Sequence, residues 1–182
     1  MKFTETPLRG AFVIEIEPRE DERGMFARTW CEKEFREHGL DTTIKQCNVS
    51  FNRHRGTLRG MHFQRAPHGE IKLVRCTRGA VHDVIIDLRR DSPTCKQHFA
   101  IRLTAQNHTM LYIPEGFAHG FQTLEDDTEL FYQMSTFYRP DAAAGVRWDD
   151  PAFGIQWPPV ERRIISERDA KLPDFHEGIL DP

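Results

Sequence analysis

The region from residue 58 to residue 135 is a succession of short β-type runs, each followed by turn residues. Closely spaced strands without helices between them are typical of an antiparallel sandwich or barrel. We therefore predict an all-β fold, an antiparallel jelly roll. The clearest predicted strands are residues 71–77, 80–88, 98–104, 109–113, 118–124 and 129–135.

The first 57 residues are more mixed. Residues 11–18 alternate between apolar and polar side chains like a strand, and residues 21–24 have the composition of a turn. Residues 31–40 have helical spacing, with Gly39 as the stop signal. We expect short helices to flank the barrel.

The last part of the chain is rich in proline and acidic side chains. We expect it to wrap the barrel and to end in a short helix near residues 166–172. A chain of 182 residues is long enough to bury one proper core. The sequence therefore predicts a single domain over residues 1–182, with a jelly-roll core at about 45–140.

The overall charge argues against two classes of partner. The net charge is −3 and the isoelectric point is about 6.3, so neither a nucleic-acid surface nor a polybasic membrane surface is expected. No apolar run approaches the roughly 18–20 residues of a membrane helix, and the N-terminus lacks a signal-peptide segment. These features predict a cytoplasmic protein. In that compartment the scattered Cys31, Cys47, Cys76 and Cys95 are expected to be ordinary thiols.

Five polar side chains interrupt the predicted barrel where a packed core would hold apolar groups: Arg59, His62, Lys72, His119 and Tyr132. Burying an unpaired charge is costly, so these side chains either face solvent or line a functional cavity. Taken singly, each has an ordinary explanation as a solvent-facing lysine, a hydrogen-bonded core histidine or a packed tyrosine. Their occurrence in one segment favours a cavity as much as it favours the ordinary explanations.

His119 lies in an apolar run just after a proline turn. We expect Gly116 and Gly120 to let the chain bend tightly there, so that the imidazole points into the cavity as a donor to a ligand. The alternative is a histidine that is hydrogen-bonded to backbone.

Histidine-bearing barrels often hold a metal ion, which requires two or three histidines and a carboxylate. The usual jelly-roll metal motif has a second histidine two residues after the first. His62 has no such neighbour, and Lys72 would repel a divalent cation. We therefore expect no metal.

Several long motifs follow one another over nearly the whole chain. They are GTLRGMHFQ (56–64), KLVRCTRGAVHDVIIDLRRDSPT (72–94), IPEGFAHGFQTLED (113–126), FYRP (137–140) and GVRWDDPAFGIQWP (145–158). In this order they resemble the dTDP-4-dehydrorhamnose 3,5-epimerases, isomerases of the cupin superfamily that convert dTDP-4-keto-6-deoxyglucose to dTDP-4-keto-rhamnose. The resemblance implies a cupin-type jelly roll without metal or cofactor, which forms a homodimer through its N-terminal strands.

The resemblance also implies four catalytic residues. His62 is similar to the general base, and Asp169 to the carboxylate that orients it. Tyr132 is similar to the acid on the opposite face of the sugar. Lys72 is similar to the group that holds the oxyanion developing at C4.

Eight further residues resemble the family's substrate-binding positions. Tyr138 is similar to the aromatic residue that stacks on the nucleotide base, while Arg23, with Phe26, is similar to a phosphate-contacting position reached from the neighbouring subunit. The full set is Arg23, Phe26, Gln46, Asn48, Arg59, His119, Tyr138 and Arg168.

The chemistry fits these assignments. C3 and C5 both flank the C4 ketone, so removing either proton gives an enolate whose charge lies largely on the C4 oxygen. A cation beside that oxygen stabilises charge that exists mainly in the transition state. Histidines, with an ordinary pKa of about 6.5, suit proton abstraction near neutral pH. Inversion also needs a proton delivered to the other face, which one base alone cannot supply.

Three positions depart from the family's usual pattern. Arg28 and Ala143 stand where acidic residues are common, and Cys47 stands where aspartate is common. We expect all three to lie near the nucleotide, so the sequence does not determine which nucleotide base the substrate carries. It also does not determine whether C3, C5 or both are inverted. A non-catalytic nucleotide-sugar-binding cupin and a metal-dependent cupin enzyme are the other readings.

Overall fold

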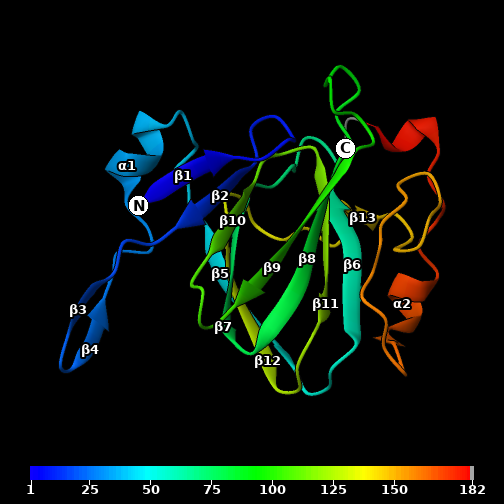
Figure 1. The fold of residues 1–182 in the computed structure, drawn as a ribbon. Helices are drawn as coiled ribbons and strands as arrows, with labels where there is room; N and C mark the ends of the chain where they lie inside the picture. The colour runs from blue at the N-terminus through cyan, green and yellow to red at the C-terminus, as the bar shows by residue number, and fades with distance from the viewer. Residues whose placement is uncertain (181–182) are drawn as a thin grey trace.

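Two antiparallel sheets pack face to face in the computed structural model, which describes residues 1–180 (Figure 1). Across the first sheet the strands are β1 (Lys2–Glu5), β2 (Phe12–Glu15), β10 (Met110–Ile113), β7 (Lys72–Arg78), β12 (Thr128–Met134) and β5 (Gln46–Asn52). Across the second they are β13 (Ala143–Gly145), β6 (Thr57–Gln64), β11 (Phe117–Thr123), β8 (Ala80–Asp87) and β9 (His98–Thr104), with β14 (Ile164–Ile165) beside β6.

The remaining elements lie outside these sheets. A hairpin of β3 (Arg19–Asp21) and β4 (Gly24–Phe26) projects away from the body of the molecule (Figure 1). The helices are α1 (Glu32–Glu37), α2 (Glu167–Ala170) and the 3-10 helix η1 (Glu177–Ile179).

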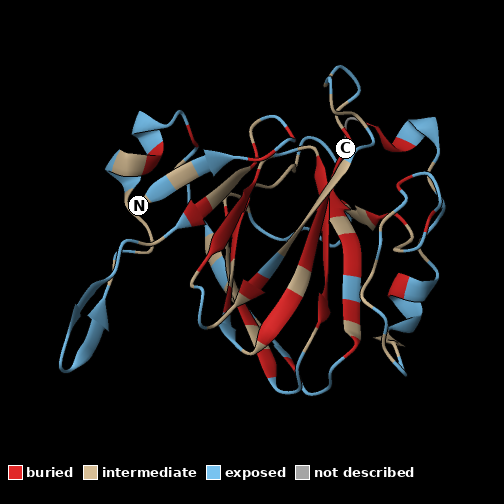
Figure 2. Ribbon diagram, in the orientation of Figure 1, coloured by how far each residue is buried: buried red, intermediate tan, exposed pale blue. Residues whose placement is uncertain are grey.

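The strand β8 shows how the apolar pattern produces this arrangement. Val81 and Ile85 belong to the core between the sheets, whereas Val84 and Ile86 belong to a second core on the other face of the same sheet. A strand that is covered on both faces reads as a nearly continuous apolar run of β-branched residues. Figure 2 shows the consequence, with buried strands in the body and exposed helices and hairpin around them.

The flanking segments cover the outer faces of the sheets. The C-terminal part packs Phe153, Ile179 and Leu180 against the outer face of the second sheet. Near the N-terminus, Phe35 of α1 is buried against the outer face of the first sheet. The space between the sheets is therefore left to the inner core and to the site described below.

The predicted all-β architecture is confirmed, and all six strands predicted between residues 71 and 135 are present within one residue of their expected ends. The helix predicted after residue 31 ends before Gly39, whose φ of +71° favours glycine. The helix predicted near 166–172 is α2. The residue pattern alone missed β1, β3, β4, β5, β13 and β14. In residues 1–180, no helix is long and apolar enough to cross a membrane.

The loop after β8 is organised by the fully buried carboxylate of Asp87. It accepts hydrogen bonds from Arg89 Nε at 2.8 Å, Ser92 Oγ at 2.5 Å and Thr94 Oγ1 at 2.7 Å. Burial raises the pKa of Asp87, but these hydrogen bonds outweigh it and hold the pKa below its usual value. The carboxylate therefore stabilises the folded chain in its ionised form.

We expect Asp87→Ala to lower the free energy of unfolding by about 3–5 kcal/mol at neutral pH, because it leaves the half-buried Arg89 and the hydroxyls of Ser92 and Thr94 without their common acceptor. Since the folded-state pKa lies below the unfolded one, this contribution is complete above about pH 4 and is lost as the pH falls further. Urea unfolding of the variant and of the wild type, at neutral pH and at a pH below about 4, measures this contribution to the free energy of unfolding. The matched control Asp91→Ala, at an exposed position of the same loop, should change stability by less than about 0.5 kcal/mol. If Asp87→Ala lost as much free energy of unfolding at low pH as at neutral pH, the ionised Asp87 carboxylate would not be the stabilising group.

Candidate active site

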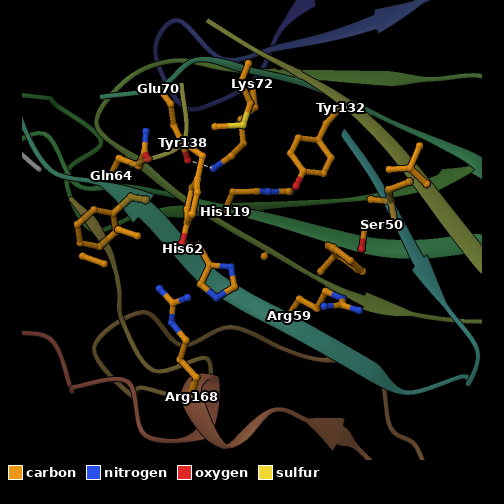
Figure 3. A pocket seen from close by; sticks show the side chains of 18 of the residues that line it. Ser50, Arg59, His62, Gln64, Glu70, Lys72, His119, Tyr132, Tyr138 and Arg168 are labelled. Carbon is orange, nitrogen blue, oxygen red and sulfur yellow. Dashed lines mark ion pairs between the residues drawn. The ribbon is translucent and has the colours of Figure 1, made fainter. Parts of the chain in front are cut away.

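A cavity of about 480 Å³ is lined by strands of both sheets, by α2 and by the segment after β12. Figure 3 shows His62, Arg59 and Arg168 on one side of this space and Tyr132, Lys72 and Glu70 on the other. Its wall thus joins residues that are far apart in the sequence. The polar side chains of the wall are Ser50, Arg59, His62, Gln64, Glu70, Lys72, His119, Tyr132, Tyr138 and Arg168.

His62, on β6, is paired with Asp169 of α2. The ring Nε2 lies 2.8 Å from Asp169 Oδ1, although 107 positions separate the two residues. The His62 side chain is 39% exposed and that of Asp169 is 7% exposed. The imidazole is therefore open to the cavity while its partner is shielded, an arrangement in which the carboxylate fixes the tautomer and orientation of a base.

Asp169 is held in place by its own surroundings. The Gly60 backbone N–H donates to Asp169 Oδ2 at 3.2 Å, and the Asp169 backbone N–H donates to the Ser166 hydroxyl that caps α2 at 3.1 Å. Burial raises the pKa of Asp169, but His62 and these neighbours outweigh it and keep the pKa below its usual value. The carboxylate is thus ionised at neutral pH and can stabilise a protonated imidazole.

Tyr132 reaches the cavity from β12, in the sheet opposite to that of His62. Burial raises the pKa of Tyr132, and the charge of Glu70 raises it further, whereas Arg59 acts in the other direction. The phenol therefore keeps its proton at neutral pH. It is a proton donor that faces a histidine across a space large enough for a ligand.

Lys72, on β7, is buried and forms an ion pair with Glu70, a partner that the sequence did not reveal. A flexible lysine stem is fixed in direction when its ammonium group is paired in this way. Its remaining N–H donors have no hydrogen bond within residues 1–180 and are available for a ligand.

His119 lines the cavity, but its Nε2 is already bonded to the fully buried Asp83, at 3.0 Å from each carboxylate oxygen. This partner is a carboxylate and not the backbone group of the alternative, and the role of His119 as a donor to a ligand stays a prediction. Gly116 has a φ of +80°, as the expected bend requires, and the pairing of β11 with β6 shifts its register between His119 and Phe121. At Gly120 a Cβ would come 2.8 Å from the Arg59 carbonyl oxygen, so this glycine is required by the close approach of β6.

The remaining polar wall is also anchored. Arg59 Nε donates to Asn52 Oδ1 at 2.8 Å, which sets the direction of the guanidinium group. The Tyr138 backbone N–H donates to Gln46 Oε1 at 2.8 Å, so the loop that presents the half-exposed Tyr138 ring is fastened to β5. Arg168, beside Asp169 on α2, lines the same end of the cavity.

Four predicted binding residues do not line the cavity of this chain. Gln46 and Asn48 lie beside it on β5, where both contact Met134 Sδ. Arg23 and Phe26 are on the projecting hairpin, where Arg23 pairs with Asp21 and Phe26 is 76% exposed. The predicted contact of Arg23 and Phe26 with substrate in the neighbouring subunit stays a prediction, because the structure contains one chain.

The three residues that depart from the family's usual pattern, Arg28, Cys47 and Ala143, lie at different places in the fold. Ala143 lines the cavity, as expected. Arg28 instead pairs with Glu34 of α1 at 2.8 Å, and Cys47 is exposed. Neither Arg28 nor Cys47 lines the chain's own cavity, and their position near the nucleotide stays a prediction.

In the part of the chain that is described, residues 1–180, no three His, Cys, Asp or Glu side chains lie close enough together to hold a metal ion. The metal-free site remains a prediction. Two functional partners were missed, Glu70 and Asp83. Asp83 had a signal in the sequence, because it is an acidic residue within the apolar run 80–88. Glu70, in a loop, had none.

Comparisons with known proteins agree with the motifs. The sequence model of the family described as dTDP-4-dehydrorhamnose 3,5-epimerase matches residues 5–177. A protein of that name from Methanothermobacter thermautotrophicus is 46% identical over 180 residues, which cover 97% of this chain and 96% of the relative. The predicted resemblance is confirmed.

Solved structures are similar over nearly their whole length. A 3,5-epimerase from Legionella pneumophila in complex with dTDP-4-keto-L-rhamnose has a TM-score of 0.92 and 31% identity, and the match covers 98% of this chain and 96% of that one. ChmJ, a 3'-monoepimerase from Streptomyces bikiniensis in complex with dTDP-quinovose, has a TM-score of 0.87 and 34% identity, covering 93% and 85%.

Proposed function

The chain belongs to the dTDP-4-dehydrorhamnose 3,5-epimerase family, and from this premise we propose how its cavity acts on a dTDP-linked 4-keto-6-deoxyhexose. The enzyme is an isomerase that inverts C3 and C5 and gives dTDP-4-keto-rhamnose for deoxysugar biosynthesis. The observation that carries the mechanism is the opposition of an oriented base, His62 with Asp169, and a protonated phenol, Tyr132, across one cavity.

His62 removes the proton from the carbon beside the ketone, and Asp169 stabilises the imidazolium that forms. The electron pair of the broken C–H bond becomes an enolate with its charge on the C4 oxygen. The ammonium group of Lys72 donates to that oxygen and stabilises it in a buried site, where such an interaction is strong. Tyr132 then returns a proton to the same carbon from the other face, and the configuration is inverted.

The cations of the wall suit the nucleotide end of the substrate. Arg59 and Arg168 can meet the pyrophosphate with forked donors, and the Tyr138 ring offers a stacking surface for the base. An acidic protein can therefore bind an acidic ligand, because the positive charge is local.

We expect Tyr132→Phe to separate proton exchange from inversion. Without the phenol, the enolate returns to substrate through His62, so deuterium from D₂O still enters at C3 and C5. Product formation should fall by about 10²–10⁴-fold, the usual contribution of a general acid. Proton NMR measures both quantities in one sample. The control Tyr112→Phe removes a phenol that is bonded to the Asp41 backbone outside the cavity, and it should leave both quantities unchanged. An equal loss of exchange and inversion in Tyr132→Phe would contradict the role.

We further propose that the enzyme acts as a homodimer in which Arg23 and Phe26 enter the partner's cavity. The hairpin that carries them projects from the body and makes no contact with its own cavity (Figure 1). The hairpin leaves Phe26 uncovered, and the edge strand β5 exposes Val49 and Phe51, at 60% and 43%. Exposed apolar groups on an edge strand and on an arm are suited to an interface between subunits.

Mixed dimers test this arrangement. His62→Asn subunits and Phe26→Ala subunits should each be impaired alone. If the arm acts on the partner, each hybrid dimer contains one fully intact site, and an equal mixture should recover about one quarter of wild-type activity. Sedimentation analysis of the same mixture reports the oligomeric state. A pure monomer, or no recovery in verified hybrids, would refute the dimeric site.

A further inference from the structure

The proposed reaction gives no role to Glu70, although its carboxylate belongs to the cavity. Its side chain is only 7% exposed, and Oε1 pairs with Lys72 Nζ. The second oxygen, Oε2, is shielded from solvent and has no hydrogen-bond partner within residues 1–180. A buried acceptor without a donor is destabilising and uncommon, so its retention calls for an explanation.

The position of Glu70 suggests what the missing donor is. Glu70 stands beside Lys72 at the same end of the cavity, facing the side of His62 (Figure 3). The terminal torsion of a glutamate is broad, so the carboxylate can turn Oε2 toward the cavity and keep one oxygen on Lys72. A ligand atom held by Lys72 would then have an acceptor next to it.

The two sides of a 4-keto-6-deoxyhexose differ in this respect. C3 carries a hydroxyl group, which can donate a hydrogen bond, whereas C5 carries the ring oxygen and a methyl group and can donate none. An ionised carboxylate is an acceptor only. With Lys72 at the C4 oxygen, the neighbouring acceptor therefore matches the C3 side of the sugar and not the C5 side.

We propose that Glu70 is a specificity residue that accepts a hydrogen bond from the C3 hydroxyl and so selects 4-keto sugars in which that hydroxyl is free. The proposal rests on the proposed function, and it adds the substrate class and the residue that reads it. The pair Lys72–Glu70 recognises a ketone and the adjacent hydroxyl as one unit.

Titration calorimetry with two unreactive ligands tests the proposal: dTDP-6-deoxyglucose and its analogue with fluorine in place of the C3 hydroxyl. Fluorine cannot donate to a carboxylate, so wild-type protein should bind the fluoro analogue about 10- to 100-fold more weakly. In Glu70→Gln the amide N–H can donate to either group, so the ratio of the two dissociation constants should fall to about threefold or less.

Two controls make the ratio specific. Glu115→Gln, at an exposed position outside the cavity wall, should keep the wild-type ratio, and dTDP alone should bind Glu70→Gln and wild type equally. An unchanged ratio in Glu70→Gln would overturn the proposal, and so would a parallel loss of dTDP binding. Because neither sugar has a C4 ketone, binding is read apart from catalysis. Wild-type protein that discriminates the two ligands but exchanges no substrate protons would refute the proposed function alone.

Discussion

His62→Asn is expected to lower kcat for epimerisation by about 10²–10⁴-fold, the usual contribution of a positioned general base. Asparagine fills much of the same space but cannot take a proton from carbon. Deuterium exchange at C3 and C5 should fall by the same factor, because both carbons depend on one base. Proton NMR of reactions in D₂O, quenched at successive times, measures inversion and exchange together.

The exposed His54, which is outside the cavity wall, provides the matched control. His54→Asn should retain wild-type exchange, and both variants should bind dTDP like the wild type. Exchange that persists at either carbon in His62→Asn would show that a second base serves that carbon, and the assignment would then be wrong.

Lys72→Met is expected to lower kcat by about 10²–10³-fold with little change in KM, because the ammonium group acts mainly on charge that develops in the transition state. Unlike Tyr132→Phe, this variant should lose exchange and inversion together, since formation of the enolate itself becomes slow. Steady-state kinetics and D₂O exchange separate the two cases.

Removing Lys72 alone leaves the Glu70 carboxylate buried and unpaired, which can disturb the fold. The double variant Glu70→Gln/Lys72→Met removes both charges and should restore the melting temperature without restoring kcat. Recovery of activity in the double variant would mean that the single variant fails through misfolding, and the role of Lys72 at the C4 oxygen would be refuted.

The barrel strands could be predicted because burial on one or both faces imposes a simple pattern. Strand β8 is apolar on both sides, and its limits follow from that run. Strand β5 escaped the pattern because its less exposed positions, Gln46, Asn48, Ser50 and Asn52, are all polar. A strand that builds a site loses the alternation by which strands are recognised.

The candidate residues of the site could be named from sequence, but their partners could not. Asp169 follows His62 by 107 positions, and only the packing of α2 against β6 brings them to 2.8 Å. The same limit explains His119, whose pairing with Asp83 depends on the register of two strands, β11 and β8. Residues 1–180 therefore contain two His–Asp pairs, and the imidazole of His62, at 39% exposed, is more open than that of His119, at 10%.

The most direct test of the account is proton NMR of dTDP-4-keto-6-deoxyglucose incubated with the wild-type enzyme in D₂O. We expect deuterium to enter at both C3 and C5 and the product to be dTDP-4-keto-rhamnose. Exchange at a single carbon would instead identify a mono-epimerase, the activity named for ChmJ. No exchange at either carbon, in protein that binds dTDP, would show that this cavity does not transfer protons.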